Sequence, residues 1–207
     1  YLERSSALDQ VTRWAVEQAV KDAAAWQQRN PRLGVAVNLT PRVIRELEFA
    51  HWLEGVLQRY NLPASRVKLE VAETALTTDH DRVERVLARL AGSGVQVAVD
   101  DFGVGASGIA YLKRLPLSQI KIDRELVGGL LESARDTSIV KAVIEMAHSL
   151  GIHVLAAGVE HDETLEALRA LECDSVQGYL VSRPLPKTRM LNWLYHWQHH
   201  QADWLQC

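Results

Sequence analysis

Short apolar runs alternate along the chain with longer amphipathic segments. Six runs have the length and β-branched content of buried strands, at 33–40, 67–73, 96–103, 119–123, 153–160 and 175–182. Around them, apolar residues recur at helical spacing near 8–28, 43–60, 79–92, 134–150, 162–171 and 187–200. Because strands and helices alternate at this spacing, the pattern predicts right-handed crossovers and a parallel sheet in a single α/β domain.

The second helical segment carries a start signal. Thr40 is followed directly by Pro41, and threonine is a favourable N-cap while proline suits the first helical position. The pair therefore predicts that a helix begins at Pro41.

Composition narrows the class of protein. The chain has 207 residues, 47% apolar and 24% charged, which is typical of a globular domain rather than a disordered or coiled-coil protein. Lys and Arg total 23 against 26 Asp and Glu, so no basic excess favours DNA binding. The two cysteines, Cys173 and Cys207, form no disulfide framework or zinc quartet, which fits a reducing compartment. No apolar run approaches the roughly 20 residues of a membrane span, and no signal peptide is visible.

Polar residues gather near the ends of the predicted strands. They are Asn38, Glu70, Glu73, Asp100, Asp101, Lys121, Asp123, Glu160 and Gln177. The carboxyl ends of parallel strands are where α/β sheets and barrels place their sites. Carboxylates inside apolar runs are costly unless they are paired or bind a metal, so we expect one shared site.

The residue types in this group favour phosphoester chemistry. Oxygen ligands without His or Cys suit Mg²⁺ or Mn²⁺ rather than zinc. Adjacent carboxylates such as Asp100 and Asp101 can hold two cations about 4 Å apart, as in two-metal hydrolysis. Lys121 would orient the attacking water or neutralise a phosphate charge. Taken alone, Asp100 and Asp101 also fit a turn that caps the next helix.

Six ordered motifs resemble one known family. They are NLTP at 38–41, LEVAE at 69–73, DDFGVGASG at 100–108, KID at 121–123, AAGVE at 156–160 and QGYLVSRPL at 177–185. From about Leu2 to Pro186 the chain resembles bacterial EAL domains, which are cyclic di-GMP phosphodiesterases. The resemblance implies a modified TIM (β/α) barrel that uses two Mg²⁺ or Mn²⁺ ions to produce linear pGpG. Some members are receptors that no longer hydrolyse the nucleotide.

The resemblance also implies a role for each matching residue. The implied metal ligands are Asn38, Glu70, Asp100 and Asp101, and Lys121 would contact the water and phosphate. Glu73, Gly103 and Gly105 would support the loop after DDFG. Glu160, Gln177 and Pro184 would line the ligand pocket.

The chain departs from the family pattern in three ways. The Glu-Ala-Leu signature has no match in residues 1–207 and only six of the family's eight strands are visible, so we expect the natural protein to carry an N-terminal segment that this chain lacks. Ala157 stands where the family has a metal-binding glutamate. The loop after DDFG carries Val104, Ala106 and Gly108 where Thr, Tyr and Ser are usual. The last two changes remove oxygen donors, so they predict weakened hydrolysis.

Three functions remain open. The first is a degenerate EAL domain, residues 1–207, that binds cyclic di-GMP or a protein partner with hydrolysis weakened or lost. The second is an active Mg²⁺- or Mn²⁺-dependent phosphodiesterase, and the third is an interaction module that binds no nucleotide. We expect the C-terminal domain of a larger cytoplasmic or membrane-anchored signalling protein, with sensor or GGDEF-like domains as partners and a homodimer as one assembly.

Overall fold

Six parallel strands form one curled sheet in chain order. The computed structural model describes residues 6–77, 79–103 and 112–204. The strands are β1 (Val35–Leu39), β2 (Val67–Ala72), β3 (Gln96–Phe102), β4 (Gln119–Ile122), β5 (His153–Ala157) and β6 (Ser175–Gln177). Each strand pairs in parallel with the next one. The predicted α/β fold with a barrel-like parallel sheet is therefore confirmed.

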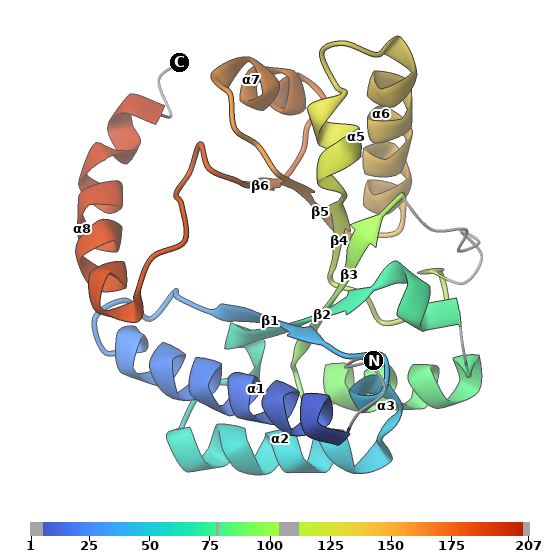
Figure 1. Ribbon diagram of the computed structural model, residues 1–207, viewed down its shortest axis with the longest axis vertical. Coiled ribbons are helices and arrows are strands. Elements are labelled where there is room, and N and C mark those ends of the chain that lie inside the picture. Colours follow the sequence, from blue (N-terminus) through green and yellow to red (C-terminus); the bar gives the residue numbers. More distant parts are fainter. Residues whose placement is uncertain (1–5, 78, 104–111, 205–207) are drawn as a thin grey trace.

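Helices surround the curled sheet on its outer side (Figure 1). They are α1 (Ser6–Gln27), α2 (Leu47–Tyr60), α3 (His80–Gly92), α5 (Arg124–Gly128), α6 (Ala134–Ser149), α7 (Asp162–Ala170) and α8 (Lys187–Trp204). Short 3₁₀ turns lie at η2 (Val43–Arg45), η3 (Ala64–Arg66) and η4 (Glu73–Thr77). Within the described ranges, no helix is both long enough and apolar enough to cross a bilayer.

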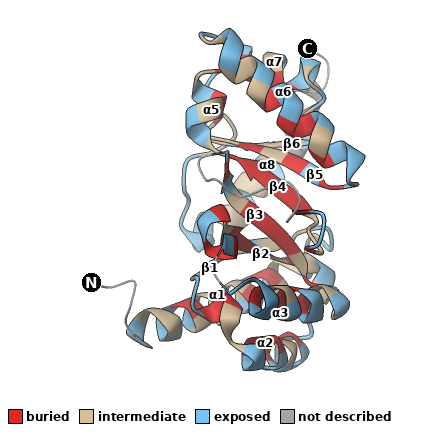
Figure 2. Ribbon diagram, turned by 90° about the vertical axis from the view of Figure 1, so that its right-hand side faces the viewer, coloured by how far each residue is buried: buried red, intermediate tan, exposed pale blue. Residues whose placement is uncertain are grey.

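The two sides of the sheet differ in chemistry. On β2, Leu69 and Val71 are fully buried and belong to the core beneath the helices. Lys68 and Glu70 alternate with them and so point to the inner side of the curl. Figure 2 shows the central strands β2, β3 and β4 largely buried, whereas exposed positions are frequent on the helices. The core thus lies between sheet and helices, and the inner side is free to carry polar groups.

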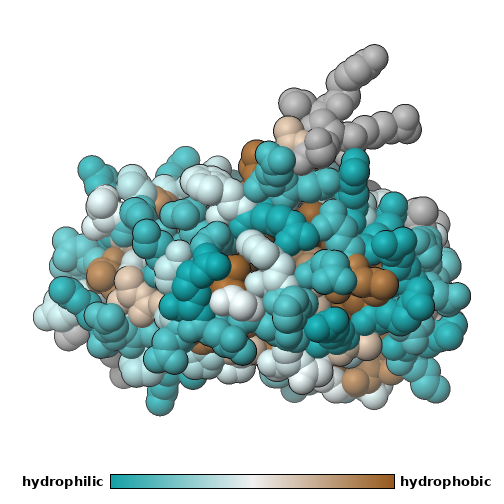
Figure 3. All heavy atoms as spheres, turned by 90° about the horizontal axis from the view of Figure 1, so that it is seen from below, coloured by the Kyte–Doolittle hydropathy of each residue, from teal (hydrophilic) through white to brown (hydrophobic). Residues whose placement is uncertain are grey.

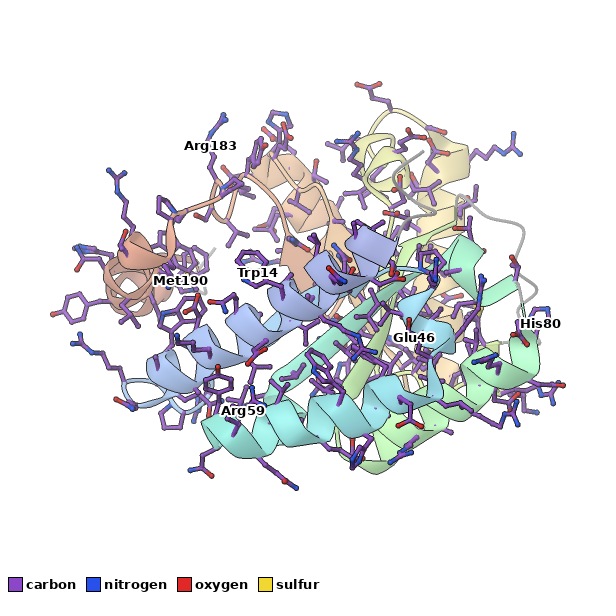
Figure 4. All side chains as sticks on the ribbon, turned by 60° about the horizontal axis from the view of Figure 1, so that its bottom comes forward. Trp14, Glu46, Arg59, His80, Arg183 and Met190 are labelled. Atoms are coloured by element: carbon purple, nitrogen blue, oxygen red, sulfur yellow. The ribbon has the colours of Figure 1, made fainter. Side chains whose placement is uncertain are left out.

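Ion pairs hold the helical layer together at its surface. Arg13 of α1 lies 2.5 Å from Glu46, which precedes α2, and Arg59 of α2 lies 2.8 Å from Glu17 of α1. Figure 4 shows Glu46 and Arg59 near opposite ends of α2. Lys187 at the start of α8 lies 3.3 Å from Asp22 of α1. The face that carries α2 is mostly hydrophilic with small apolar patches (Figure 3).

Several predicted boundaries were wrong. The strands predicted at 153–160 and 175–182 end at Ala157 and Gln177. Beyond Ala157 the backbone turns at Gly158, which has a φ of +78°. Val159 then donates its N–H to Gln177 O and accepts a hydrogen bond from Leu180 N–H. The short helix α5 was not predicted, because five residues are too few to show helical periodicity.

The predicted helix start at Pro41 was also wrong. The chain forms only the 3₁₀ turn η2 there, and α2 begins at Leu47 after an extended Glu46. The Thr40 hydroxyl is buried and has no hydrogen-bond partner in the part of the chain that the structure describes, so it does not act as an N-cap there. The break at Glu46 lets α2 take a direction that packs Phe49 and Leu53 into the core.

We predict that Gly178→Ala lowers the free energy of unfolding by about 2–3 kcal/mol, because overpacking strains a closely packed backbone. A Cβ at Gly178 would overlap the backbone N and O of Val159. The Val159 N–H donates to Gln177 O, and Val159 O accepts a hydrogen bond from Leu180 N–H. The added methyl group would therefore force the ends of β5 and β6 apart. The control Gly55→Ala lies in α2 with open space around it and should stabilise by up to about 1 kcal/mol. Urea unfolding measures both, and equal midpoints for the two variants would contradict the prediction.

We also predict that Asp174 makes stability depend on acidic pH. Burial raises the pKa of its carboxyl, but the Val154 N–H bond at 2.7 Å and the nearby His148 and His153 outweigh burial and hold the pKa below its ordinary value. A depressed folded pKa gives stability that is present above about pH 3.9 and is lost as pH falls toward the folded pKa.

Asp174→Asn should therefore flatten the fall in stability below about pH 4, measured by urea midpoints at several pH values. Asp81→Asn, at an exposed position in the first turn of α3, is the matched control. The prediction fails if Asp174→Asn leaves the acid limb of the wild-type curve unchanged.

Candidate active site

Strand register brings the predicted polar residues to the same side of the sheet. Asn38 pairs with Glu70, and Ala72, two residues after Glu70, pairs with Asp100. Paired residues of parallel strands point to the same side, and side chains alternate with a period of two. Asn38, Glu70 and Asp100 therefore share the inner face of the curl, near the carboxyl ends of β1, β2 and β3.

Lys121 of β4 is the centre of this group. Its Nζ lies 2.7 Å from Glu70 Oε2 and 3.0 Å from Asp100 Oδ1. Lys121 is 5% exposed and Glu70 8%, so neither charge is solvated by bulk water. A buried charge persists only when it is paired, and here two carboxylates share one ammonium.

This pairing keeps Lys121 charged. Burial lowers the pKa of its ammonium, but hydrogen bonds and charge from Glu70 and then Asp100 outweigh burial and raise the pKa above the ordinary value. The residue is therefore a fixed positive charge and a hydrogen-bond donor on the inner face. A fixed cation of this kind suits contact with phosphate oxygens and not proton transfer near neutral pH.

Asn38 completes the group from β1. One atom of its side-chain amide lies 3.2 Å from both Asp100 Oδ2 and Glu70 Oε2. When the amide nitrogen takes that place, it donates to both carboxylates. When the amide oxygen takes it, three oxygen atoms face one another, which is favourable only around a cation.

The donor types of this group fit Mg²⁺ or Mn²⁺, because only oxygen ligands from carboxylates and an amide are offered. In the structure, the Lys121 ammonium is the cation that neutralises Glu70 and Asp100. Within the described residues, no group of three or more His, Cys, Asp and Glu side chains is arranged to hold a metal ion. A metal would therefore bind Asn38, Glu70 and Asp100 in competition with the ammonium.

Asp101 follows Asp100 in a left-handed conformation, with φ of +55°. Such a φ is uncommon outside glycine, and Asp tolerates it better than most residues. Its N–H donates to Asp100 Oδ1 at 3.0 Å. Burial, and then the negative charges of Asp100 and Asp123, raise the pKa of its carboxyl. Asp123 itself caps α5 by accepting from Glu125 N at 2.7 Å.

Glu73 supports the chain just after this turn. It is 2% exposed, and its Oε2 accepts a hydrogen bond from Gly103 N at 3.1 Å. Gly103 has φ of +105°, and a Cβ there would lie 2.5 Å from Leu126 Cδ1, so only glycine fits. Glu73 therefore holds the end of β3 through Gly103, and its support of the loop that follows stays a prediction. Gly105, Val104, Ala106 and Gly108 lie outside the described residues.

Ala157 lies on the same inner face. Lys121 pairs with Leu155, so Ala157, two residues further along β5, points to the side of Lys121. It pairs with Gln177 at the end of β6. A carboxylate at position 157 would thus extend the inner acidic group, and alanine leaves the place without an oxygen donor.

Two of the three predicted ligand residues line a hollow at the end of β6. Gln177 and Pro184 line a hollow of about 590 Å³ together with Trp193 of α8, while Glu160 is exposed and does not line it. Figure 4 shows Met190 of α8, also in this hollow, on the side where α8 approaches α1. The structure therefore brings together Asn38, Glu70, Asp100 and Lys121. Gln177 lies two strands further along the curl, where it pairs with Ala157 and lines the hollow with Pro184.

Two inner residues were missed from the sequence. Lys68 Nζ donates to Gln119 Oε1 at 2.8 Å, one layer nearer the amino-terminal ends of the strands. Burial, only partly offset by the charge of Glu70, lowers the pKa of the Lys68 ammonium. The alternation of side chains along a strand could have identified both residues. Lys68 stands two residues before Glu70, and Gln119 two residues before Lys121, so each shares the inner side of the sheet.

We predict that Lys121→Met lowers the free energy of unfolding by about 3 kcal/mol without divalent ions, because it leaves the buried Glu70 and the partly buried Asp100 without a cation. Added Mn²⁺ should restore part of this loss by taking the ammonium's role. Urea unfolding with EDTA and with Mn²⁺ measures the effect. Lys141→Met, which removes an exposed partner 3.8 Å from Glu145, is the control. Equal losses in both variants would refute the central role of Lys121.

Comparison with known proteins places the chain in a family. A family model described as the EAL domain matches residues 1–184. The cyclic di-GMP phosphodiesterase NbdA of Pseudomonas aeruginosa is 38% identical over 185 residues, which are 89% of this chain and 24% of that protein. The chain spans about a quarter of the length of the curated relatives it matches.

Solved structures agree with this match. The structure described as PaMucR phosphodiesterase in complex with c-di-GMP has a TM-score of 0.87 and 32% identity, covering 91% of this chain and 76% of the other. A manganese and cyclic di-GMP complex of BlrP1 from Klebsiella pneumoniae has a TM-score of 0.76 and 34% identity, covering 85% of this chain and 45% of the other. From its sequence and its fold alike, the chain belongs to the EAL domain family.

Proposed function

We propose that this EAL domain binds cyclic di-GMP on its inner face and hydrolyses it weakly or not at all. The observation that carries the proposal is the convergence of Asn38, Glu70, Asp100 and Lys121 on one side, with Ala157 on that same side. Relatives named as cyclic di-GMP phosphodiesterases and a neighbour solved with c-di-GMP support the ligand.

The roles of the residues follow from their chemistry. Asn38, Glu70, Asp100 and Asp101 would hold Mg²⁺ or Mn²⁺, which when bound supply a Lewis acid and an activated water. Lys121 would neutralise charge on a phosphate of the ligand, since its ammonium stays protonated. Glu73 would keep the loop after β3 in place through Gly103. Gln177, Pro184 and Glu160 would contact the nucleotide further from the phosphates.

The weakening of hydrolysis follows from position 157. Alanine gives neither a ligand for a cation nor a hydrogen bond to an attacking water. Two cations close together need several carboxylates to neutralise them, and one is missing here. Loss of a group that contacts the reacting water commonly costs orders of magnitude in rate.

An active phosphodiesterase is the second candidate. The Glu70–Lys121–Asp100 group favours it, because a merely structural barrel gains little from two acids and a lysine on its inner face. The two candidates share the ligand and differ in turnover, so one pair of measurements separates them.

The test measures binding and turnover on the same protein. Calorimetry follows cyclic di-GMP binding, and chromatography follows the formation of pGpG with Mn²⁺ present. Saturable binding with little or no pGpG supports the proposal. Rapid pGpG formation supports the active enzyme, and the absence of any binding leaves a module that acts on proteins alone.

We predict that Ala157→Glu raises the rate of pGpG formation by about 100-fold, since it restores an acid beside the reacting water. The control Ala157→Gln has the same size without the charge and should stay near the wild-type rate. Binding of cyclic di-GMP should change far less than turnover. If Ala157→Glu folds, binds the nucleotide and hydrolyses it no faster than the wild type, position 157 is not what limits hydrolysis.

A further inference from the structure

The inner face has a second charged region at the opposite end of the strands. Arg32, Arg66 and Lys68 line a hollow of about 340 Å³ beside the amino-terminal ends of β1 and β2. Ser65 and Gln96 line the same hollow with a hydroxyl and an amide. The polar lining of the hollow is therefore rich in hydrogen-bond donors, and among the described residues no acidic side chain lines it.

What these three cations share is one hollow, since other basic residues in the described ranges, such as Lys113 and Arg135, also make no ion pair. Nine basic residues in the described ranges each lie within 4.0 Å of a carboxylate. They are Arg13, Arg42, Arg59, Arg89, Arg114, Arg169, Lys121, Lys141 and Lys187. Across residues 6–77, 79–103 and 112–204, no such ion pair involves Arg32, Arg66 or Lys68. Three like charges thus line one hollow without an ion pair from the described residues, and the nearby negative charge that acts on Lys68 is that of Glu70, two residues along β2.

The fold holds the cations in place despite their repulsion. Arg66 Nη1 donates to the backbone O of Arg32 at 3.2 Å, so one arginine is tied to the segment that carries the other. Lys68 is half-buried and uses one of its three donors on Gln119 Oε1. Its remaining donors, the guanidinium group of Arg32 and the remaining donors of Arg66 are left for a ligand.

We propose that this hollow binds a phosphate group, either free inorganic phosphate or the terminal phosphate of a phosphomonoester. Two guanidinium groups and an ammonium give several charge-assisted donors, which match the three or four oxygens and double charge of phosphate better than a single carboxylate. A long polyanion is a poor fit, because the net charge of the chain is −3 and the positive charge is confined to the hollow.

The position separates this site from the one that the proposed function uses. Lys68 precedes Glu70 by two residues on β2, whereas Asn38, Asp100 and Ala157 lie toward the carboxyl ends of their strands. A phosphate bound by Lys121 and one bound by Arg32 and Arg66 would therefore perturb different backbone amides. The proposal does not depend on cyclic di-GMP binding.

Titration of the protein with inorganic phosphate, followed by amide NMR shifts at constant ionic strength and without divalent ions, tests the site. We expect saturable shifts at Gly34, Ser65 and Ala36, and none of similar size at Asp101 or Gly103. The variant Arg32→Gln/Arg66→Gln should weaken binding by about tenfold or more, since each charged hydrogen bond contributes substantially. The control Arg85→Gln/Lys141→Gln removes the same charge elsewhere and should stay within about twofold of wild type.

A second titration with ribose 5-phosphate distinguishes the two sources of phosphate. Equal or tighter binding than inorganic phosphate assigns a phosphomonoester, and weaker binding assigns the free ion, while both outcomes uphold the site. Non-saturable shifts, shifts confined to Asp101 and Gly103, or equal weakening in both double variants would overturn the proposal. The spectra of each variant also show whether it is folded.

Discussion

The constraint on which this structure depends is that charges inside a curled sheet must be paired. Lys121 lies between Glu70 and Asp100; Lys121 and Glu70 are buried, and Asp100 is partly buried. Removing the lysine would leave two acids close together in a poorly solvated interior. The group also fixes the strand register, because a slip of one residue would turn Glu70 or Lys121 into the apolar layer under the helices.

Much of this could be predicted from sequence for the same reason. Charged residues two apart in an apolar strand, such as Lys68 and Glu70, have only one side on which they can be tolerated. Six strands and a shared polar face follow from that alternation. What sequence could not give was set by local backbone geometry: the extended Glu46 that delays α2, the turn at Gly158 that ends β5, and the five-residue α5. None of these leaves a periodic pattern.

The inner face is electrically divided along the strands. Its carboxyl-terminal side offers acids around one lysine, and its amino-terminal side offers unpaired cations around a hollow. Glu70 lies between Lys68 and Lys121, so its charge influences both ammonium groups. A sheet arranged in this way favours cations or metal-assisted phosphate at one end and a bare phosphate at the other. The two ends can therefore take ligands of related chemistry by different means.

Ala157 lowers the negative charge at the carboxyl-terminal side of the inner face, compared with a glutamate at that position. An additional carboxylate there would attract divalent ions and repel a phosphate that arrives without them. With alanine, fewer negative charges face the ligand, and the positive charge of Lys121 contributes a larger share of the electrostatic potential there. On the proposed function, the substitution that removes support for hydrolysis also lowers the electrostatic cost of holding an anionic dinucleotide when metal is scarce. Loss of turnover and retention of the ligand are then two results of one missing carboxylate.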